Sequence, residues 1–100
     1  MLFNNLVSQS GGGTELTIVN VNISPSGSAT YPIPESATLI CFAGYSNGNS
    51  GAIYKRTESG IVTLETDLNY TMTITPSADA ITIKSQAADS YNITGTLAYK

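Results

Sequence analysis

The sequence contains no histidine and no tryptophan, one cysteine, and charged side chains at only 11% of its positions. Without histidine, neither a Ser-His-Asp triad nor a histidine metal site can form within the chain. A single cysteine cannot make an internal disulfide or a thiolate zinc cage. Four basic residues cannot neutralise a phosphate backbone, so we expect no nucleic-acid binding. These absences predict a protein without a cofactor or a metal.

Long apolar runs are also missing from the sequence. No stretch approaches the roughly 20 residues that a membrane-spanning helix needs, so we expect no membrane insertion. The first seven residues lack a positively charged start and an apolar core of about 7–15 residues, and they do not read as a secretory signal peptide. We therefore expect a protein that is made and assembled in the cytoplasm.

Small polar residues take the place of charge. Ser, Thr, Asn and Gly make up 42 of the 100 residues, and Val, Ile, Thr, Tyr and Phe make up 35. The second group favours pleated, half-buried surfaces, and no segment has a convincing helical period of 3.6 residues. The composition therefore predicts an all-β protein.

The chain divides into an N-terminal arm with a glycine hinge, residues 1–13, and a single β-sandwich domain, residues 14–100. Residues 8–13 (SQSGGG) form the hinge, which is flexible by composition. Apolar side chains on an extended arm are costly in water, so the arm either folds back on its own domain or docks on a partner chain. The glycines favour the partner. The predicted assembly residues are Leu2, Phe3, Leu6 and Val7.

Short alternating segments, separated by turns at intervals of roughly 8–12 residues, predict about eight strands in a two-sheet antiparallel sandwich. A jelly-roll-like order is our first expectation. An immunoglobulin-like order is the alternative, although the Cys…Trp…Cys pattern of that fold is absent. The predicted strands are residues 16–23, 29–33, 37–45, 52–57, 61–66, 70–75, 81–84 and 91–100.

Two of these segments depart from simple alternation. Leu16 and Ile18 have one parity and the apolar residues of 19–23 have the other, which predicts a bulge or a strand that moves between sheets. Segment 37–45 is apolar on both faces. This pattern predicts a central strand that is covered on both sides, by its own fold or by a neighbouring subunit.

One predicted hairpin combines the residue types of a sugar-binding surface. A tyrosine ring can stack on the apolar face of a pyranose while asparagine side chains bind its hydroxyls. We expect such a contact at Tyr45, Asn47 and Asn49, with Tyr54 facing Tyr45 across the hairpin. The alternative interpretation is that these rings cap the core and extend their hydroxyls into water.

The charged residues form no catalytic pattern. The carboxylates lie mostly in or beside predicted turns, whereas a glycosidase needs two of them about 5–10 Å apart across a cleft. Lys55 and Arg56 form the one basic pair, which we interpret as a solvated hairpin end. We therefore expect that the protein is not an enzyme.

A short apolar arm, a glycine joint and a charge-poor sandwich together resemble the small virion proteins of tailed bacteriophages, such as head-decoration proteins and the tips of head or tail fibres. The resemblance is carried by residues 6–13 (LVSQSGGG), 37–48 (ATLICFAGYSNG) and the terminal segment 91–100. It implies a repeated, trimeric structural subunit that contacts other virion proteins and is located in the virion after assembly in the host cytoplasm. A fibre tip of this kind can itself bind a host-surface glycan.

Size and charge also favour self-association. A sandwich of about 100 residues has a thin core, and its open sheets leave edge strands that need protection. Lys55, Arg56 and Lys84 are the internal basic residues that could repel an incoming strand. We therefore expect a homo-oligomer in which sister subunits cover these surfaces.

Overall fold

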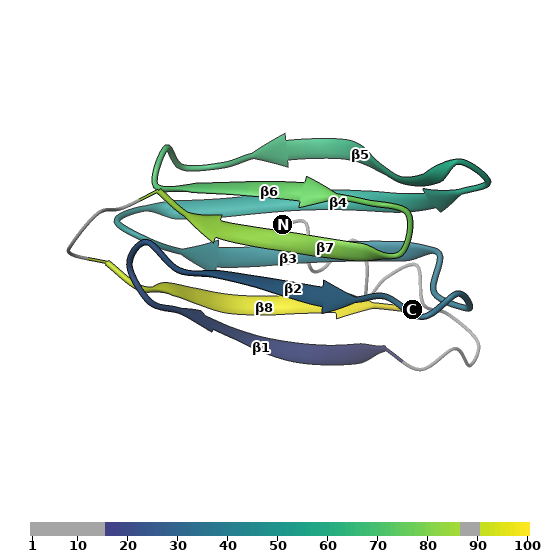
Figure 1. The fold of residues 1–100 in the computed structure, drawn as a ribbon, viewed down its shortest axis with the longest axis horizontal. Helices are drawn as coiled ribbons and strands as arrows, with labels where there is room; N and C mark the ends of the chain where they lie inside the picture. Colours follow the sequence, from purple (N-terminus) through teal and green to yellow (C-terminus); the bar gives the residue numbers. More distant parts are fainter. Residues whose placement is uncertain (1–15, 87–90) are drawn as a thin grey trace.

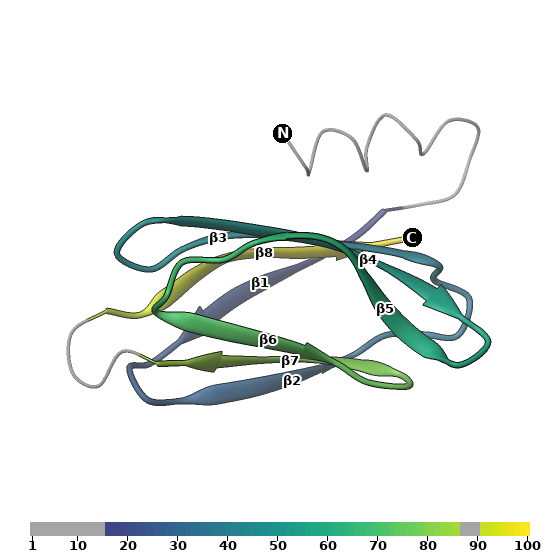
Figure 2. The same ribbon diagram turned by 90° about the horizontal axis from the view of Figure 1, so that it is seen from above.

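The computed structural model describes residues 16–86 and 91–100, and the described chain is all-β (Figure 1). Eight strands form two antiparallel sheets that pack face to face (Figure 2). The predicted eight-strand sandwich is confirmed, whereas the assembly residues predicted in the arm lie outside the described residues. The strands are β1 (Thr17–Ile23), β2 (Ser28–Pro32), β3 (Leu39–Tyr45), β4 (Asn49–Thr57), β5 (Gly60–Asp67), β6 (Met72–Pro76), β7 (Ala80–Ser85) and β8 (Ile93–Tyr99).

The strand order is β1-β8-β3-β4-β5 in the five-stranded sheet and β2-β7-β6 in the three-stranded sheet. The first strand pairs with the last and the second with the second-to-last, as in a jelly-roll-like chain path. The third and sixth strands, however, pair with their sequence neighbours β4 and β7 rather than with each other. The β3-β4-β5 meander thereby stays in one sheet, as it does in an immunoglobulin variable domain. The observed order combines features of both predicted alternatives.

Alternate side chains of the two sheets meet in a single core. In β3, Ile40 and Phe42 are fully buried in this core, while Cys41 belongs to a separate apolar cluster on the opposite face. The predicted two-sided apolar strand is therefore central, since β3 is the third strand of five. The largest core side chains that are excluded from solvent are Ile40, Phe42, Tyr54, Ile81, Ile83, Ile93 and Leu97.

The change of parity in β1 does not have the predicted cause. All seven residues of β1 pair with β8 in unbroken register, so β1 contains no bulge and stays in one sheet. Val21 and Ile23 pack into the core, whereas Ile18 faces outward and is 56% exposed. The register shift occurs instead between β4 and β5, next to Ile53. Apolar residues of both parities in β1 therefore mark a strand with two apolar faces.

β3 and β8 approach each other closely at a pair of glycines. Gly44 of β3 lies opposite Gly95 of β8. A Cβ atom on Gly95 would overlap the backbone of Ala43 and Gly44, and one on Gly44 would overlap the ring of Phe42. The packing of the two central strands therefore requires the absence of a side chain at both positions.

Candidate functional site

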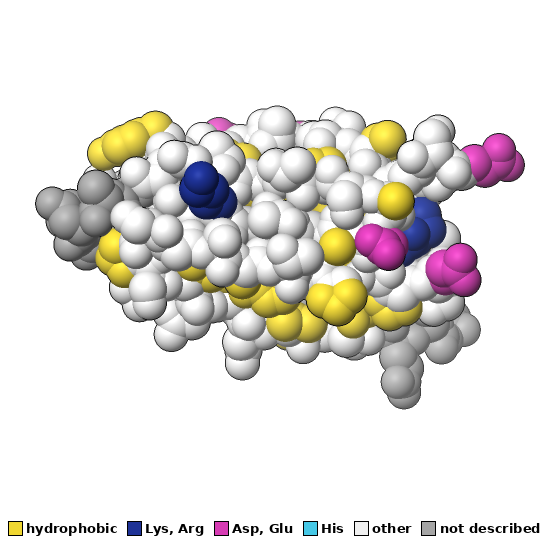
Figure 3. All heavy atoms as spheres, in the orientation of Figure 1, with side chains coloured by type: hydrophobic (Ala, Val, Ile, Leu, Met, Phe, Trp, Pro, Cys, Tyr) yellow, Lys and Arg dark blue, Asp and Glu magenta, His cyan; other side chains and the backbone are white. Residues whose placement is uncertain are grey.

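The two outer faces of the sandwich have different chemistry. On the three-stranded sheet, Thr30, Thr82 and Thr75 stand side by side across β2, β7 and β6. The hydroxyls of Thr30 and Thr82 form a hydrogen bond of 3.0 Å. Figure 3 shows this side of the molecule, where most of the surface is neither hydrophobic nor charged. Such a face is typical of a sheet that borders water.

The outer face of the five-stranded sheet is apolar across four of its strands. Ile18 of β1 pairs with Ala98 of β8, Ala98 with Cys41 of β3, and Cys41 with Ile53 of β4. A second row pairs Leu39 with Lys55 and Lys55 with Val62. We name this surface the outer apolar face and define it as Leu16, Ile18, Leu39, Cys41, Ile53, Val62 and Ala98.

The outer apolar face is buried at its centre and open at its sides. Cys41 and Ala98 are fully excluded from solvent, with Leu16 and Leu39 packed against them. On β1 and β5, by contrast, Ile18 is 56% exposed and Val62 is 41% exposed. Burial raises the pKa of the Cys41 thiol to about 11, so the thiol is protonated at neutral pH and is a poor nucleophile. The face can therefore bind apolar groups, and its cysteine plays no evident chemical part.

A second candidate site is built by two loops at one end of the sandwich, the β3–β4 turn and the β5–β6 connection. We name it the loop cluster. Asn47 Nδ2 donates a hydrogen bond to Tyr70 Oη at 3.2 Å, and Asn69 Nδ2 donates to the carbonyl oxygen of Asn47 at 3.0 Å. Thr71 Oγ1 donates to the carbonyl oxygen of Ser46 at 2.7 Å. The cluster consists of Ser46, Asn47, Asn69, Tyr70 and Thr71.

The local backbone explains how these loops meet. Asn47 has a φ of 53° and Gly48 a φ of 144°, so the Asn-Gly pair forms the hairpin turn that the sequence predicts. A side chain on Gly48 would overlap the amide of Asn69. Ser46 Oγ is buried and has no hydrogen-bond partner among the described residues. The absence of a side chain at Gly48 thus leaves space for Asn69 of the neighbouring loop.

Of the four residues of the predicted sugar contact, the structure places Tyr54 apart from the other three. Tyr45 lies opposite Asn49 in the ladder and is 55% exposed, and Asn47 joins the loop cluster. Tyr54, however, pairs with Ile40 on the inner face and is only 1% exposed. Its burial raises the pKa of its hydroxyl to about 12. The prediction that Tyr54 faces Tyr45 is therefore wrong, because Tyr54 is a core residue.

Tyr70 is the aromatic residue that the sequence analysis missed at this end of the molecule. Its side chain is 80% exposed, and its hydroxyl is held by Asn47. In the sequence, Tyr70 reads as part of an alternating strand, whereas the structure places it in a loop just before β6. No local pattern could have shown that it meets Asn47, which lies 23 residues earlier in the chain.

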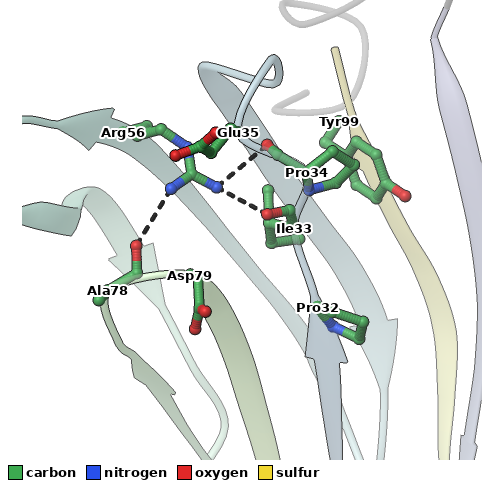
Figure 4. A pocket seen from close by; sticks show the side chains of 8 residues that line it. All are labelled: Pro32, Ile33, Pro34, Glu35, Arg56, Ala78, Asp79 and Tyr99. Carbon is green, nitrogen blue, oxygen red and sulfur yellow. Dashed lines mark hydrogen bonds between the residues drawn. The ribbon is translucent and has the colours of Figure 1, made fainter.

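Arg56 is the other residue whose role the sequence did not reveal. Nε donates to the carbonyl oxygen of Ala37 at 3.0 Å, and Nη1 donates to that of Ala78 at 3.1 Å. Nη2 donates to the carbonyl oxygens of Ile33 at 2.7 Å and Pro34 at 3.1 Å (Figure 4). The interpretation of Arg56 as a solvated hairpin end is wrong, since it ties β4 to the β2–β3 and β6–β7 connections.

The depression around Arg56 offers few hydrogen-bonding groups to a ligand. It is lined by Pro32, Pro34, Glu35, Asp79 and other residues of these connections. A guanidinium has five N–H donors, and four of them are used by backbone carbonyls here. Arg56 therefore stabilises the fold, and one of its N–H donors has no partner among residues 16–86 and 91–100.

Within residues 16–86 and 91–100, no group of three or more acidic, cysteine or histidine side chains is placed to hold a metal ion. The same residues include no helix long and apolar enough to cross a membrane. Comparisons of the chain with protein-family models, with curated proteins and with solved structures found no match.

Proposed function

We propose that this protein is a non-enzymatic structural subunit that assembles with copies of itself through its sheet surfaces and its N-terminal arm. The observation that carries the proposal is the outer apolar face. A monomeric soluble protein seldom leaves a contiguous apolar patch open, and such patches commonly mark contacts with other proteins. Here Ile18 and Val62 are exposed at its two sides.

The contrast between the two outer faces supports the same proposal. The threonine-rich face of β2, β7 and β6 has the composition of a surface in water, although it belongs to the same small sandwich. The outer apolar face carries Lys55 within it, and Glu65 lies opposite Ile53 at its border. Protein interfaces commonly combine apolar contacts with a small number of charged side chains at their border, as Glu65 is here.

The sequence resemblance supplies the setting for this proposal. We propose that the subunit belongs to the virion of a tailed bacteriophage, as a capsid decoration or a head- or tail-fibre component. In this setting it forms a trimer and contacts other virion proteins. The arm, the glycine joint and the charge-poor composition support this setting. Many copies held at high local concentration on a particle would assemble through a modest interface.

Self-association is the direct test of the structural function. We expect the average mass from light scattering to increase with concentration for residues 1–100, for a chain without residues 1–13, or for both. The double substitution Ile18→Lys and Val62→Lys is expected to weaken association by at least about tenfold, because it places unpaired charge in an apolar contact. Thr75→Lys, on the threonine-rich face, is the matched control and should leave association unchanged. A strict monomer with and without residues 1–13 would contradict the proposal.

The loop cluster favours a second function, the binding of a surface glycan. Tyr70 presents an exposed ring whose position is fixed by its hydrogen bond to Asn47. Tyr45 adds a second exposed ring on the strand that leads into the same turn. Fixed aromatic rings beside amide groups can stack on a sugar and bind its hydroxyls. This function is compatible with the first, because a fibre subunit can bind a host glycan.

A glycan array tests the second function. We expect a glycan bound by the intact chain to lose at least about tenfold in affinity with Tyr70→Ala or Tyr45→Ala, since each removes a stacking ring. Tyr91→Ala, which removes an exposed ring just before β8, is the control. Binding that survives both tyrosine substitutions would exclude this site.

A further inference from the structure

We propose that two copies of this chain join edge to edge through β1, which pairs with β1 of the second copy in an antiparallel register centred on Asn20. This pairing extends the five-stranded sheet across both subunits. The inference rests on the proposed self-assembly and names one of its contacts.

β1 has the properties of an unprotected edge strand. It lies at one edge of the five-stranded sheet, along one border of the molecule in Figure 1. Its seven residues (TIVNVNI) include no charged residue, no proline and no glycine. Within residues 16–86 and 91–100, β1 pairs with β8 in unbroken register and with no strand on its other side. Such an edge is a template for pairing with a strand of another chain.

The other three edge strands carry features that discourage such pairing. Pro32 ends β2 and Pro76 ends β6, and a proline cannot donate to a strand ladder. β5 carries Glu65 and Asp67, and the register shift of the large sheet lies in its pairing with β4. Proline, charge and irregular pairing all protect sheet edges, and β1 has none of them.

The ladder of β8 shows which backbone groups of β1 point outward. Leu39 N–H donates to the carbonyl oxygen of Lys100 at 3.2 Å, and Lys100 N–H donates to that of Leu39 at 3.1 Å. Because such pairs alternate in an antiparallel ladder, even-numbered residues of β8 bond to β3 and odd-numbered residues bond to β1. Their partners in β1 are also odd-numbered. The N–H and C=O groups of Ile18, Asn20 and Asn22 therefore point away from β8.

These outward groups are self-complementary. When Asn20 lies opposite Asn20 of the second copy, Ile18 lies opposite Asn22, and all seven residues of β1 are paired. The outward groups then face one another, and each such pair exchanges two hydrogen bonds. Partners of equal parity also keep the inner faces of the two sheets on one side. Val19, which packs against the core, then lies opposite Val21 of the second copy.

A second copy is the occupant that this edge favours. The triplet Val19-Asn20-Val21 reads the same in both directions, so an antiparallel copy presents the same side-chain types around a two-fold axis. Since β1 carries no charge, no like charges oppose each other across the pairing. In the proposed virion setting, this two-fold contact joins subunits of two neighbouring trimers.

Cysteine cross-linking tests the register. The Cα atoms of a hydrogen-bonded antiparallel pair are about 5.5 Å apart, which a disulfide can span. We therefore expect Asn20→Cys chains to form disulfide-linked dimers with oxidised glutathione. Asn22→Cys is the matched control and should form at least about tenfold less dimer, because its two cysteines would lie ~14 Å apart along the strands. An equimolar mixture of Asn22→Cys and Ile18→Cys chains should form a mixed dimer. Cys41 is fully buried and common to all these chains.

Asn20→Pro tests the backbone contribution. The N–H that it removes points outward, so the substitution leaves the ladder with β8 intact and blocks the pairing of two β1 strands. We expect the association constant from sedimentation equilibrium to decrease at least about tenfold. Asn20→Thr replaces the same side chain and keeps the N–H, and it should associate as the unmodified chain does. Circular dichroism establishes whether each variant retains the sandwich.

The possible results separate this inference from the proposed function. Dimers specific to position 20, together with weaker association of Asn20→Pro, support pairing at β1. Equal cross-linking at positions 20 and 22, or association that Asn20→Pro leaves unchanged, overturns the pairing and leaves the outer apolar face and the arm as the assembly contacts. If Asn20→Pro does not fold, the cross-linking comparison decides alone. A chain that stays monomeric and forms no cross-link overturns both proposals.

Discussion

Gly95→Ala is expected to lower the free energy of unfolding by about 3 kcal/mol, the upper end of the usual cost of overpacking a core. Gly95 lies between Val21 of β1 and Gly44 of β3. The added methyl group would overlap the carbonyl oxygen of Ala43 and the Cα atom of Gly44. Both are backbone atoms, so no rotamer change relieves the overlap. The central strands would have to move apart.

The sign of this effect makes the experiment decisive. In an ordinary strand interior, alanine is more favourable than glycine by about 0.5–1 kcal/mol, so without the close approach the substitution would stabilise the protein. Urea unfolding followed by tyrosine fluorescence and circular dichroism gives the free energy. Thr94→Ala, at the exposed neighbouring position of β8, is the control and should change stability by less than about 1 kcal/mol. A Gly95→Ala chain as stable as the unmodified protein would disprove the close contact of β3 and β8.

Arg56→Lys is expected to destabilise the protein by about 2–4 kcal/mol, although it preserves the positive charge. The guanidinium fork donates to four carbonyl oxygens, those of Ile33, Pro34, Ala37 and Ala78. A lysine ammonium is a compact group with three donors, and it cannot form four hydrogen bonds to carbonyl oxygens placed around a planar guanidinium. The part-buried carbonyls of Ile33 and Ala37, and the exposed ones of Pro34 and Ala78, would then lose their partners.

The same unfolding assay measures this second effect. Lys55→Ala changes the adjacent exposed residue and is expected to alter stability by no more than about 0.5 kcal/mol, which makes it the matched control. Raising the salt concentration should leave the difference in stability between the unmodified protein and the Arg56→Lys variant nearly unchanged, because hydrogen-bond geometry rather than long-range charge causes it. Equal stability of the two chains would show that the carbonyl contacts contribute little.

The strands themselves could be predicted because alternation is a local property. Met72 and Ile74 on β6, and Ile81 and Ile83 on β7, are separated by threonines; Met72, Ile81 and Ile83 lie in the core and Ile74 packs against it. Turn residues such as Asn47-Gly48 carry their conformational preference in their own chemistry. For such segments, neighbours along the chain contain the needed information.

The predicted facing of Tyr54 and Tyr45 failed because it depends on the strand register. The sequence places the turn at residues 46–51, but the structure begins β4 at Asn49, so Tyr45 lies opposite Asn49. This shorter turn sets Tyr54 opposite Ile40 on the inner face. A change in turn length moves side chains to new partners, and a change of one residue exchanges the two faces of a strand. Composition alone does not contain that length.

The sequence by itself determined that this chain is all-β, that its polarity comes from hydroxyls and amides rather than charge, and that β3 carries apolar residues on both faces. Only the tertiary structure decided that Ile18, Cys41 and Ile53 share one outer face, that Tyr70 meets Asn47, and that Arg56 binds distant carbonyls. Alternation specifies which residues of a strand share a side. The order of strands in a sheet, and hence which sides join into one surface, depends on contacts between segments far apart in the chain.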